Sequence, residues 1–231
     1  QVVGTSKIVG DTADRAFRTA PNRPIDPLTD NLGTLGGAFS RGAAINDAGQ
    51  VVGTAATADV GPFASTVSRA FRADPGVPMI DLGTLAPSGG INGFNNSGAN
   101  AINGAANVVG FATVPADSCG SSSHAFRTFA DALINPAVGN LGTLVPAPYA
   151  GCRSSTAYGV NSQSLTVGDS ATNVATGVPN HAFRYTPFGG MIDIGTLGGR
   201  DSTAYAVNDL GEIVGRSDLP TDLVNNPFNS P

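Results

Sequence analysis

The chain has 231 residues, of which 41% are hydrophobic and 13% are charged, and its formal net charge is −5. This apolar fraction is enough to bury a core and excludes wholesale disorder. The acidic balance, without a basic run or a Trp, excludes the electrostatic footprint of a nucleic-acid-binding protein. No apolar stretch reaches the roughly 18 residues that span a bilayer. Gly (31) and Pro (16) are plentiful, whereas Lys7 is the only lysine and Glu212 the only glutamate. Because strong helix formers are scarce, the composition favours strands and tight turns.

Internal repetition is the main signal, because four short motifs recur along the chain in one fixed order. The first motif is a Val-Gly segment with β-branched residues, which is typical of a short strand. It occurs as Val2-Val3-Gly4, Val51-Val52-Gly53, Val108-Val109-Gly110, Thr166-Val167-Gly168 and Ile213-Val214-Gly215. In the first repeat Ile8-Val9-Gly10 matches equally well, so the register there stays open.

The second and third motifs are Ala-Phe-Arg and Gly-Thr-Leu, and each indicates a strand or its edge. The second occurs as Ala16-Phe17-Arg18, Ala70-Phe71-Arg72, Ala125-Phe126-Arg127 and Ala182-Phe183-Arg184, preceded by Arg15, Arg69, His124 and His181. The third occurs as Gly33-Thr34-Leu35, Gly83-Thr84-Leu85, Gly142-Thr143-Leu144 and Gly195-Thr196-Leu197, preceded two residues earlier by Asn31, Asp81, Asn140 and Asp193.

The fourth motif begins with Ser and ends with Asn. It runs from Ser40 to Asn46, Ser97 to Asn103, Ser155 to Asn161 and Ser202 to Asn208. Turn sequences such as Asn46-Asp47-Ala48-Gly49 follow, in which Asn accepts left-handed geometry and Gly supplies positive φ at low cost. We therefore expect this motif to pass through a tight turn into the next Val-Gly strand.

Each repeat is predicted to form a four-stranded antiparallel meander whose strands follow the order of the four motifs. A repeated meander of roughly 50 residues is typical of a β-propeller blade. The expected fold is all-β, a β-propeller of four four-stranded blades, with five blades as the second choice and an open solenoid as the third. The single repeat domain 1–231 then divides into units 1–46, 47–103, 104–161 and 162–208 and a C-terminal closing strand within 209–231.

Neighbouring blades must cover each other, because one repeat cannot bury its apolar face alone. The predicted core between blades consists of Phe17, Phe71, Phe126 and Phe183 with Leu35, Leu85, Leu144 and Leu197. The additional Val-Gly strand at Ile213-Val214-Gly215 has two interpretations. It either closes the ring by overlapping the first strand or pairs with a neighbouring molecule, since an exposed strand edge recruits partners.

The two cysteines, Cys119 and Cys152, fall in the third repeat. In the predicted meander Cys119 follows the Val-Gly strand and Cys152 follows the Gly-Thr-Leu strand, and alternate loops of a meander emerge at the same end. We therefore predict a Cys119–Cys152 disulfide, with two free loop thiols as the alternative. A disulfide indicates an oxidising, extracellular location.

The polar residues do not repeat as a catalytic set. No Gly-x-Ser-x-Gly elbow is present. His124 and His181 occupy a position that the other repeats fill with Arg, and Asp81 and Asp193 alternate with Asn. Paired carboxylates for glycoside hydrolysis and repeated calcium ligands are therefore disfavoured. We expect no catalytic residue, no metal and no cofactor.

The Arg of the second motif repeats in full, as Arg18, Arg72, Arg127 and Arg184. The favoured interpretation is a set of hydrogen bonds between blades, to the Asp and Asn side chains or to carbonyl groups. The alternative is a contact to an anionic sugar or to a protein partner.

The run His181-Ala182-Phe183, followed by residues 193–199 and 207–215, resembles the HAF-type extracellular repeat family, which is named for His-Ala-Phe. The resemblance extends through all four units, but Arg15 and Arg69 stand where that family has His. The family is mostly described from bacterial genomes as secreted or surface-associated proteins. The resemblance implies an extracellular setting, and it implies no reaction and no catalytic residue.

Together these features predict an extracellular structural or assembly protein without catalytic activity, which self-associates into filaments or a surface layer. The alternative is a lectin-like propeller that binds surface or matrix glycans, although the low aromatic content (6%, no Trp) counts against it. A hydrolase with a site on its loops is the third hypothesis.

Overall fold

The computed structural model describes residues 1–8, 10, 12–60, 66–86, 95–114, 122–145, 153–172 and 179–220. This part of the chain is all-β and contains no α-helix, and its strands are grouped into separate antiparallel sheets. No helix among the described residues is long and apolar enough to cross a membrane. The expected fold class is thus confirmed at the level of an all-β protein built from four-stranded antiparallel sheets.

Three sheets have four strands each. Sheet II consists of β3 (Gly36–Ile45), β4 (Val51–Val60), β5 (Thr66–Ala73) and β6 (Ile80–Asp81). Sheet III consists of β7 (Ser97–Ile102), β8 (Val108–Thr113), β9 (Ser123–Arg127) and β10 (Asn140–Gly142). Sheet IV consists of β11 (Ser155–Val160), β12 (Thr166–Ala171), β13 (Asn180–Thr186) and β14 (Gly190–Gly195).

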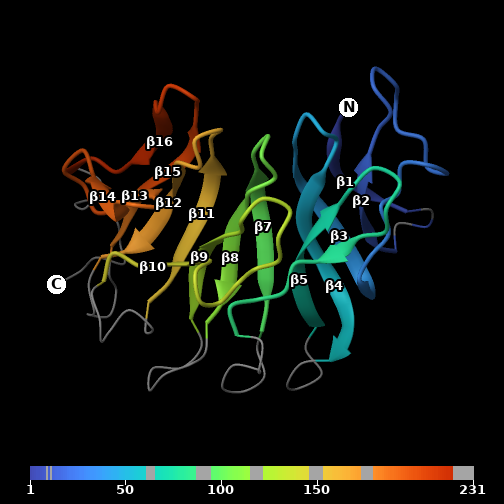
Figure 1. Ribbon diagram of the computed structural model, residues 1–231, viewed down its shortest axis with the longest axis horizontal. Helices are drawn as coiled ribbons and strands as arrows, with labels where there is room; N and C mark the ends of the chain where they lie inside the picture. Colours follow the sequence, from blue (N-terminus) through green and yellow to red (C-terminus); the bar gives the residue numbers. More distant parts are fainter. Residues whose placement is uncertain are drawn as a thin grey trace.

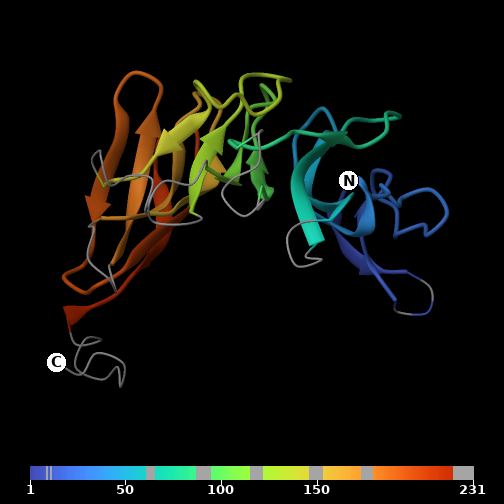
Figure 2. The same ribbon diagram turned by 90° about the horizontal axis from the view of Figure 1, so that it is seen from below.

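A two-stranded sheet lies at each end of the molecule. Sheet I pairs β1 (Val3–Lys7) with β2 (Asp14–Arg18), and sheet V pairs β15 (Ser202–Val207) with β16 (Ile213–Ser217). Figures 1 and 2 show the sheets side by side in chain order, with sheets I and V at opposite ends of an open row. The described sheets therefore do not form the closed ring that was the first expectation.

Each sheet begins one motif earlier than the predicted meander. The strand of the Ser-to-Asn motif pairs with the Val-Gly strand that follows it, as β3 pairs with β4. The expected order, with this strand last in its sheet, is wrong because the turn after Asn46 forms a hairpin, in which Gly49 N–H donates to Asn46 O at 2.9 Å. Sheet I consequently lacks a Ser-to-Asn strand, and sheet V has only this strand and a Val-Gly strand.

The Gly of the Val-Gly motif is required by a close approach of two strands. The register shifts beside it, as between Gly42 and Ala44 of β3, and this bulge brings the backbone of β3 against Gly53. A Cβ at Gly53 would overlap Arg41 O, and it would also lie 2.9 Å from the ring of Phe71. The same criterion settles the open register in the first repeat, because Gly4 pairs with Phe17 as Gly53 pairs with Phe71.

Phe71, Phe126 and Phe183 are fully buried between adjacent sheets. Each ring faces the preceding sheet, so that Phe126 of sheet III shares a core cluster with Val52 and Leu85 of sheet II. The eight predicted core residues differ in burial by their position in the row. Leu85 is buried, Leu35, Leu144 and Phe17 are partly buried, and Leu197 is 70% exposed. The last two lie at the ends of the row.

Replacing Phe126 by Ala should lower the free energy of unfolding by about 3–5 kcal/mol, because truncation of a fully buried ring leaves a cavity. Denaturant unfolding followed by circular dichroism measures this change. The matched control is Phe188→Ala, whose ring is fully exposed and whose loss should change the free energy by less than about 0.5 kcal/mol. Equal losses in the two variants would contradict the placement of Phe126 between sheets.

A buried serine joins every pair of neighbouring sheets. The hydroxyl of Ser155 on β11 accepts a hydrogen bond from Ala125 N–H at 2.8 Å and donates one to Gly142 O at 2.5 Å, both in sheet III. Three further serines make the same two bonds: Ser40 to Ala16 and Gly33, Ser97 to Ala70 and Gly83, and Ser202 to Ala182 and Gly195. The first residue of the fourth motif thus connects the second and third motifs of the preceding sheet.

The Asn that ends the fourth motif forms a second connection between sheets. The side-chain amide of Asn103 donates to Asn161 O at 2.9 Å, and its Oδ1 accepts the N–H groups of Ala105 and Asn107 in its own turn. Asn46 donates in the same way to Asn103 O, and Asn161 to Asn208 O. Each of these asparagine side chains therefore stabilises its own hairpin turn and also links its sheet to the next one.

Ser155→Ala should destabilise the protein strongly, because it leaves two buried backbone groups of sheet III without a partner. Each such group costs about 1–3 kcal/mol. Thermal and denaturant unfolding measure the loss. Ser6→Ala is the control, since the Ser6 hydroxyl donates only to the neighbouring Lys7 O at 3.3 Å, and a loss as large in this control would refute the role of the buried bridge.

Candidate interaction site

Two of the four repeated arginines, Arg18 and Arg72, contact a neighbouring sheet. Arg18 donates from Nη1 to Gly49 O at 2.7 Å and to Ala73 O at 3.2 Å, both in sheet II. Arg72 is buried, and it pairs with Asp74 at 3.0 Å and with Asp131, beyond β9, at 3.2 Å. Arg127 is half-buried and Arg184 is exposed. Arg18 and Arg72 thus make the contacts between sheets that the favoured interpretation expects, and a contact of the four Arg with an anion or a partner stays a prediction.

The two histidines and their acidic neighbours form turns at strand edges. The ring Nδ1 of His181 lies 2.8 Å from Asp193 Oδ2, and Asp193 Oδ1 accepts Gly195 N–H at 2.7 Å. His124 and Asn140 repeat this arrangement at 2.9 Å. Asn140, which cannot act as a base, makes the same contacts as Asp193. The arrangement therefore stabilises a turn. Within the described ranges, no group of three or more His, Cys, Asp or Glu side chains is placed to hold a metal ion.

Cys119 and Cys152 both lie outside the described residues. Two described residues that follow the cysteines in the chain are hydrogen-bonded, because Ser123 N–H donates to Ser154 Oγ at 3.4 Å. Ser123 follows Cys119 by four positions and Ser154 follows Cys152 by two. The Cys119–Cys152 disulfide therefore stays a prediction.

We expect the Cys119–Cys152 disulfide to form in protein purified under oxidising conditions. Alkylation without prior reduction should then leave the intact mass unchanged, whereas alkylation after reduction should add two labels. Reduction should also lower the stability by about 3–4 kcal/mol on the chain-entropy model. Two labels before reduction would show free thiols.

The bulged residues in the first strands of sheets IV and V form an aromatic pair. Tyr158 and Tyr205 occupy the bulge positions of β11 and β15, and their rings meet edge to face with centroids 6.1 Å apart. Burial raises the pKa of the Asp169 carboxyl above its ordinary value, while the hydroxyl of Thr203 and the charge of Arg216 oppose this shift. Burial also raises the pKa of the Tyr158 phenol, with a smaller contribution from Asp169.

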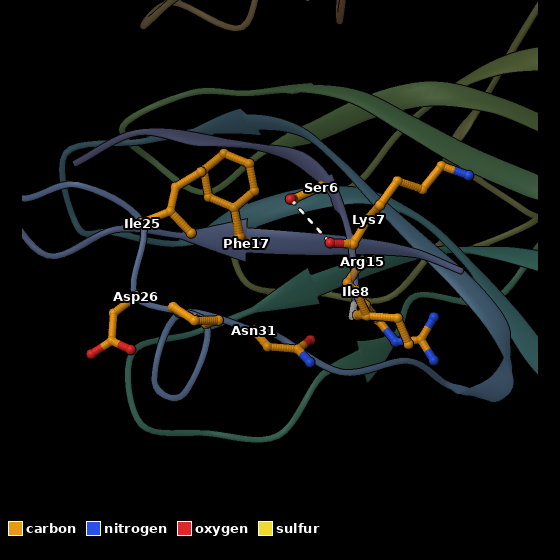
Figure 3. A pocket seen from close by; sticks show the side chains of 9 residues that line it. Ser6, Lys7, Ile8, Arg15, Phe17, Ile25, Asp26 and Asn31 are labelled. Atoms are coloured by element: carbon orange, nitrogen blue, oxygen red, sulfur yellow. Dashed lines mark hydrogen bonds between the residues drawn. The ribbon is translucent and has the colours of Figure 1, made fainter. Parts of the chain in front are cut away.

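A pocket of about 350 Å³ opens on the outer face of sheet I. Its lining consists of Ser6, Lys7, Ile8, Arg15, Phe17, Ile25, Asp26, Pro27 and Asn31. Figure 3 shows the ring of Phe17 and the side chain of Ile25 together on one side of this pocket, with Lys7 and Arg15 on the other. Phe17 corresponds to the ring that faces the preceding sheet in sheets II to IV, so this pocket marks a face without a neighbouring sheet.

A groove of about 350 Å³ lies at the opposite end, between sheets IV and V. We call it the sheet V groove, and its lining consists of Ala182, Ile194, Gly195, Thr196, Leu197, Ser202, Thr203, Ala204, Ile213, Gly215, Arg216 and Ser217. Ile194 is 42% exposed and Leu197 is 70% exposed. The equivalent Leu141 and Leu144 of sheet III are covered by sheet IV. In the inner sheets, a phenylalanine ring of one sheet packs against two apolar residues of the preceding sheet. The first end of the row therefore exposes the ring side of this contact, and the other end exposes the side that receives the ring.

Sequence reasoning identified Phe17 and Leu197 but not Ile194. The signal was present, because the residue between Asp or Asn and Gly-Thr-Leu is apolar in every repeat: Leu32, Leu82, Leu141 and Ile194. Comparisons with protein-family models, with curated proteins and with solved structures gave no match for this chain. The functional interpretation therefore depends on the geometry of the two ends.

Proposed function

We propose that this protein is a non-catalytic structural repeat protein that self-associates through its two terminal sheets. One observation carries the proposal: each end of the row exposes one side of a contact that is buried between the inner sheets. Phe17 is half-buried at the first end, whereas the three equivalent rings are fully buried. Ile194 and Leu197 are exposed at the other end.

Different surfaces at the two ends favour association from head to tail. Such heterologous contacts produce a ring when the rotation closes and an open filament when it does not. Among the described residues no strand pairs with the second edge of β16, which adds a backbone hydrogen-bonding surface at the same end, and unpaired edges recruit further strands. These features support a homopolymer, either as filaments or as a surface layer.

The propeller architecture belongs to this proposal. Each complete sheet has four antiparallel strands and packs through its first strand on the preceding sheet, as the blades of a propeller do. Closure of the ring then requires the incomplete sheets I and V of different molecules to combine, because the two sheets lie at opposite ends of the row.

An extracellular location is also proposed. It is supported by the predicted Cys119–Cys152 disulfide, since disulfides persist in oxidising compartments. The resemblance of His181-Ala182-Phe183 and its neighbours to the HAF-type extracellular repeat family agrees with this location.

Purified protein should associate in a concentration-dependent way, because both apolar ends become buried only in an assembly. Size-exclusion chromatography with light scattering measures the mass over a series of concentrations, and negative-stain electron microscopy shows the form of the assembly. A single monomeric species at every concentration would overturn the proposed function.

Glycan binding is the alternative function, and one feature favours it. Tyr205 is half-exposed beside Tyr158, and exposed aromatic rings next to a carboxylate such as Asp169 are suited to stack on a sugar. A glycan array probed with monomeric protein separates the two functions, because a structural protein should give no specific signal there.

A further inference from the structure

Sheet V has an edge that no described strand covers. In sheets II to IV the Val-Gly strand pairs on one side with the Ser-to-Asn strand and on the other with the Ala-Phe-Arg strand. Among the described residues β16 pairs only with β15, so its second edge has no strand. The position that an Ala-Phe-Arg strand fills in the other sheets is open there.

Phe183 shows what such a strand brings. Its ring lies over Gly168 of the adjacent strand, where a Cβ would come within 2.8 Å of the ring. The ring enters a core cluster made largely by the preceding sheet, which contains Val109, Ala125, Leu141 and Ala157, with Leu144 packed against it. An aromatic socket between two sheets is therefore complete only when the Ala-Phe-Arg strand is present.

The sheet V groove has the same composition, one sheet further along. The residues equivalent to the Phe183 socket are Val167, Ala182, Ile194, Ala204 and Leu197, and the glycine below the ring position is Gly215. Five of these six residues line the groove, and the sixth, Val167, belongs to the adjoining core cluster. The groove is thus a socket for a phenylalanine ring.

The walls of this socket are held in place without a ring inside. Ser202 accepts Ala182 N–H at 2.8 Å and donates to Gly195 O at 2.6 Å, and Ser217 accepts Leu197 N–H at 2.8 Å. Sheet V is therefore fixed on sheet IV by hydrogen bonds. Because the site exists before binding, little ordering opposes the entry of a strand.

We infer that the sheet V groove receives β2 of a second copy of this chain, with Phe17 in the aromatic socket. This inference rests on the proposed self-association. Among the four Ala-Phe-Arg strands, only β2 carries a ring that is not fully buried. The opposite positions of sheets I and V in the row point to a second copy and not to the same molecule (Figure 1).

The pairing has a defined register. β1 now pairs with β2 through Val3 and Arg18, Gly4 and Phe17, and Thr5 and Ala16. In the assembly β16 replaces β1, so that Val214, Gly215 and Arg216 lie opposite Arg18, Phe17 and Ala16. This matches the pairing of Gly53 with Phe71 in sheet II.

The exchange completes both end sheets at once. The strand order becomes β15, β16, β2 and then the segment at Asn31, which already forms a bridge to Phe17. This is the order of the four motifs in sheets II to IV. The exchange costs the β1–β2 pairing and the packing of Val3 against the core cluster, and β16 replaces both, because Val214 takes the position of Val3 opposite Arg18.

Two complementary variants test the inference. Ile194→Asp places a charge in the exposed wall of the socket and leaves β2 intact, whereas Phe17→Ala removes the ring and leaves the socket intact. Each variant alone should self-associate about 100-fold more weakly than the native chain, as expected for loss of a central aromatic anchor. An equimolar mixture should form a heterodimer and stop there, because its two remaining ends are defective. Light scattering and analytical ultracentrifugation measure both results.

Matched controls are available in the chain. Ile192→Asp adds the same charge on β14 at a similarly exposed position outside the groove lining, and Phe188→Ala removes a fully exposed ring. Both should associate as the native chain does. Circular dichroism and thermal unfolding confirm that every variant is folded.

A crosslink gives a second measurement that does not depend on the stability of Phe17→Ala. Arg15→Cys and Ser217→Cys, introduced in separate copies and mixed, should form an interchain disulfide, because these positions face each other in the proposed register. A mixture of Phe188→Cys and Ser217→Cys should not.

The outcomes separate the inference from the proposed function. Assembly of the native chain with unchanged association of Ile194→Asp and Phe17→Ala overturns the strand exchange but leaves self-association in place. Weak association of both variants without a heterodimer in the mixture also overturns it. A native chain that stays monomeric overturns the proposed function and the inference together.

Discussion

The structure depends on one hydrogen-bonding group, the buried hydroxyl of the serine that opens each fourth motif. Ser155 bonds an N–H of one strand and a carbonyl of the next strand in the preceding sheet, and three other serines do the same. A sheet interior offers few free backbone groups. These become available where Gly142, at positive φ, shifts the register between β9 and β10. The irregularity in one sheet is thus the attachment point of its neighbour.

The remaining motif residues follow from this attachment. Small residues are needed where strands approach, which explains Ala125 and Gly110, and the space above each such glycine accommodates a ring from the adjacent strand, such as Phe126. The apolar contact and the polar contact are complementary. The rings and the aliphatic residues around them bury apolar surface between sheets. The serine and asparagine bonds link defined backbone groups of neighbouring sheets.

Much of this could be predicted from the sequence, since four motifs in a constant order indicate the strands and their number. The sheet boundary was misplaced by one strand, because the repeat period is the same wherever counting starts and only the hairpin turn after Asn46 decides which strands pair. The burial of Phe17 and Leu197 was overestimated for a related reason. Periodicity describes an interior repeat, whereas Phe17 and Leu197 face the ends of the row, where no further sheet covers them.

The asparagine bonds give the row of sheets a direction. Asn46, Asn103 and Asn161 each donate toward the C-terminal side, so one end of the series presents the carbonyl of Asn46 and the other the amide of Asn208. Two molecules related by a twofold axis would set like groups against each other and could not prolong the series. Any assembly that extends it must therefore be polar, with all subunits pointing the same way and two chemically distinct ends that can grow at different rates.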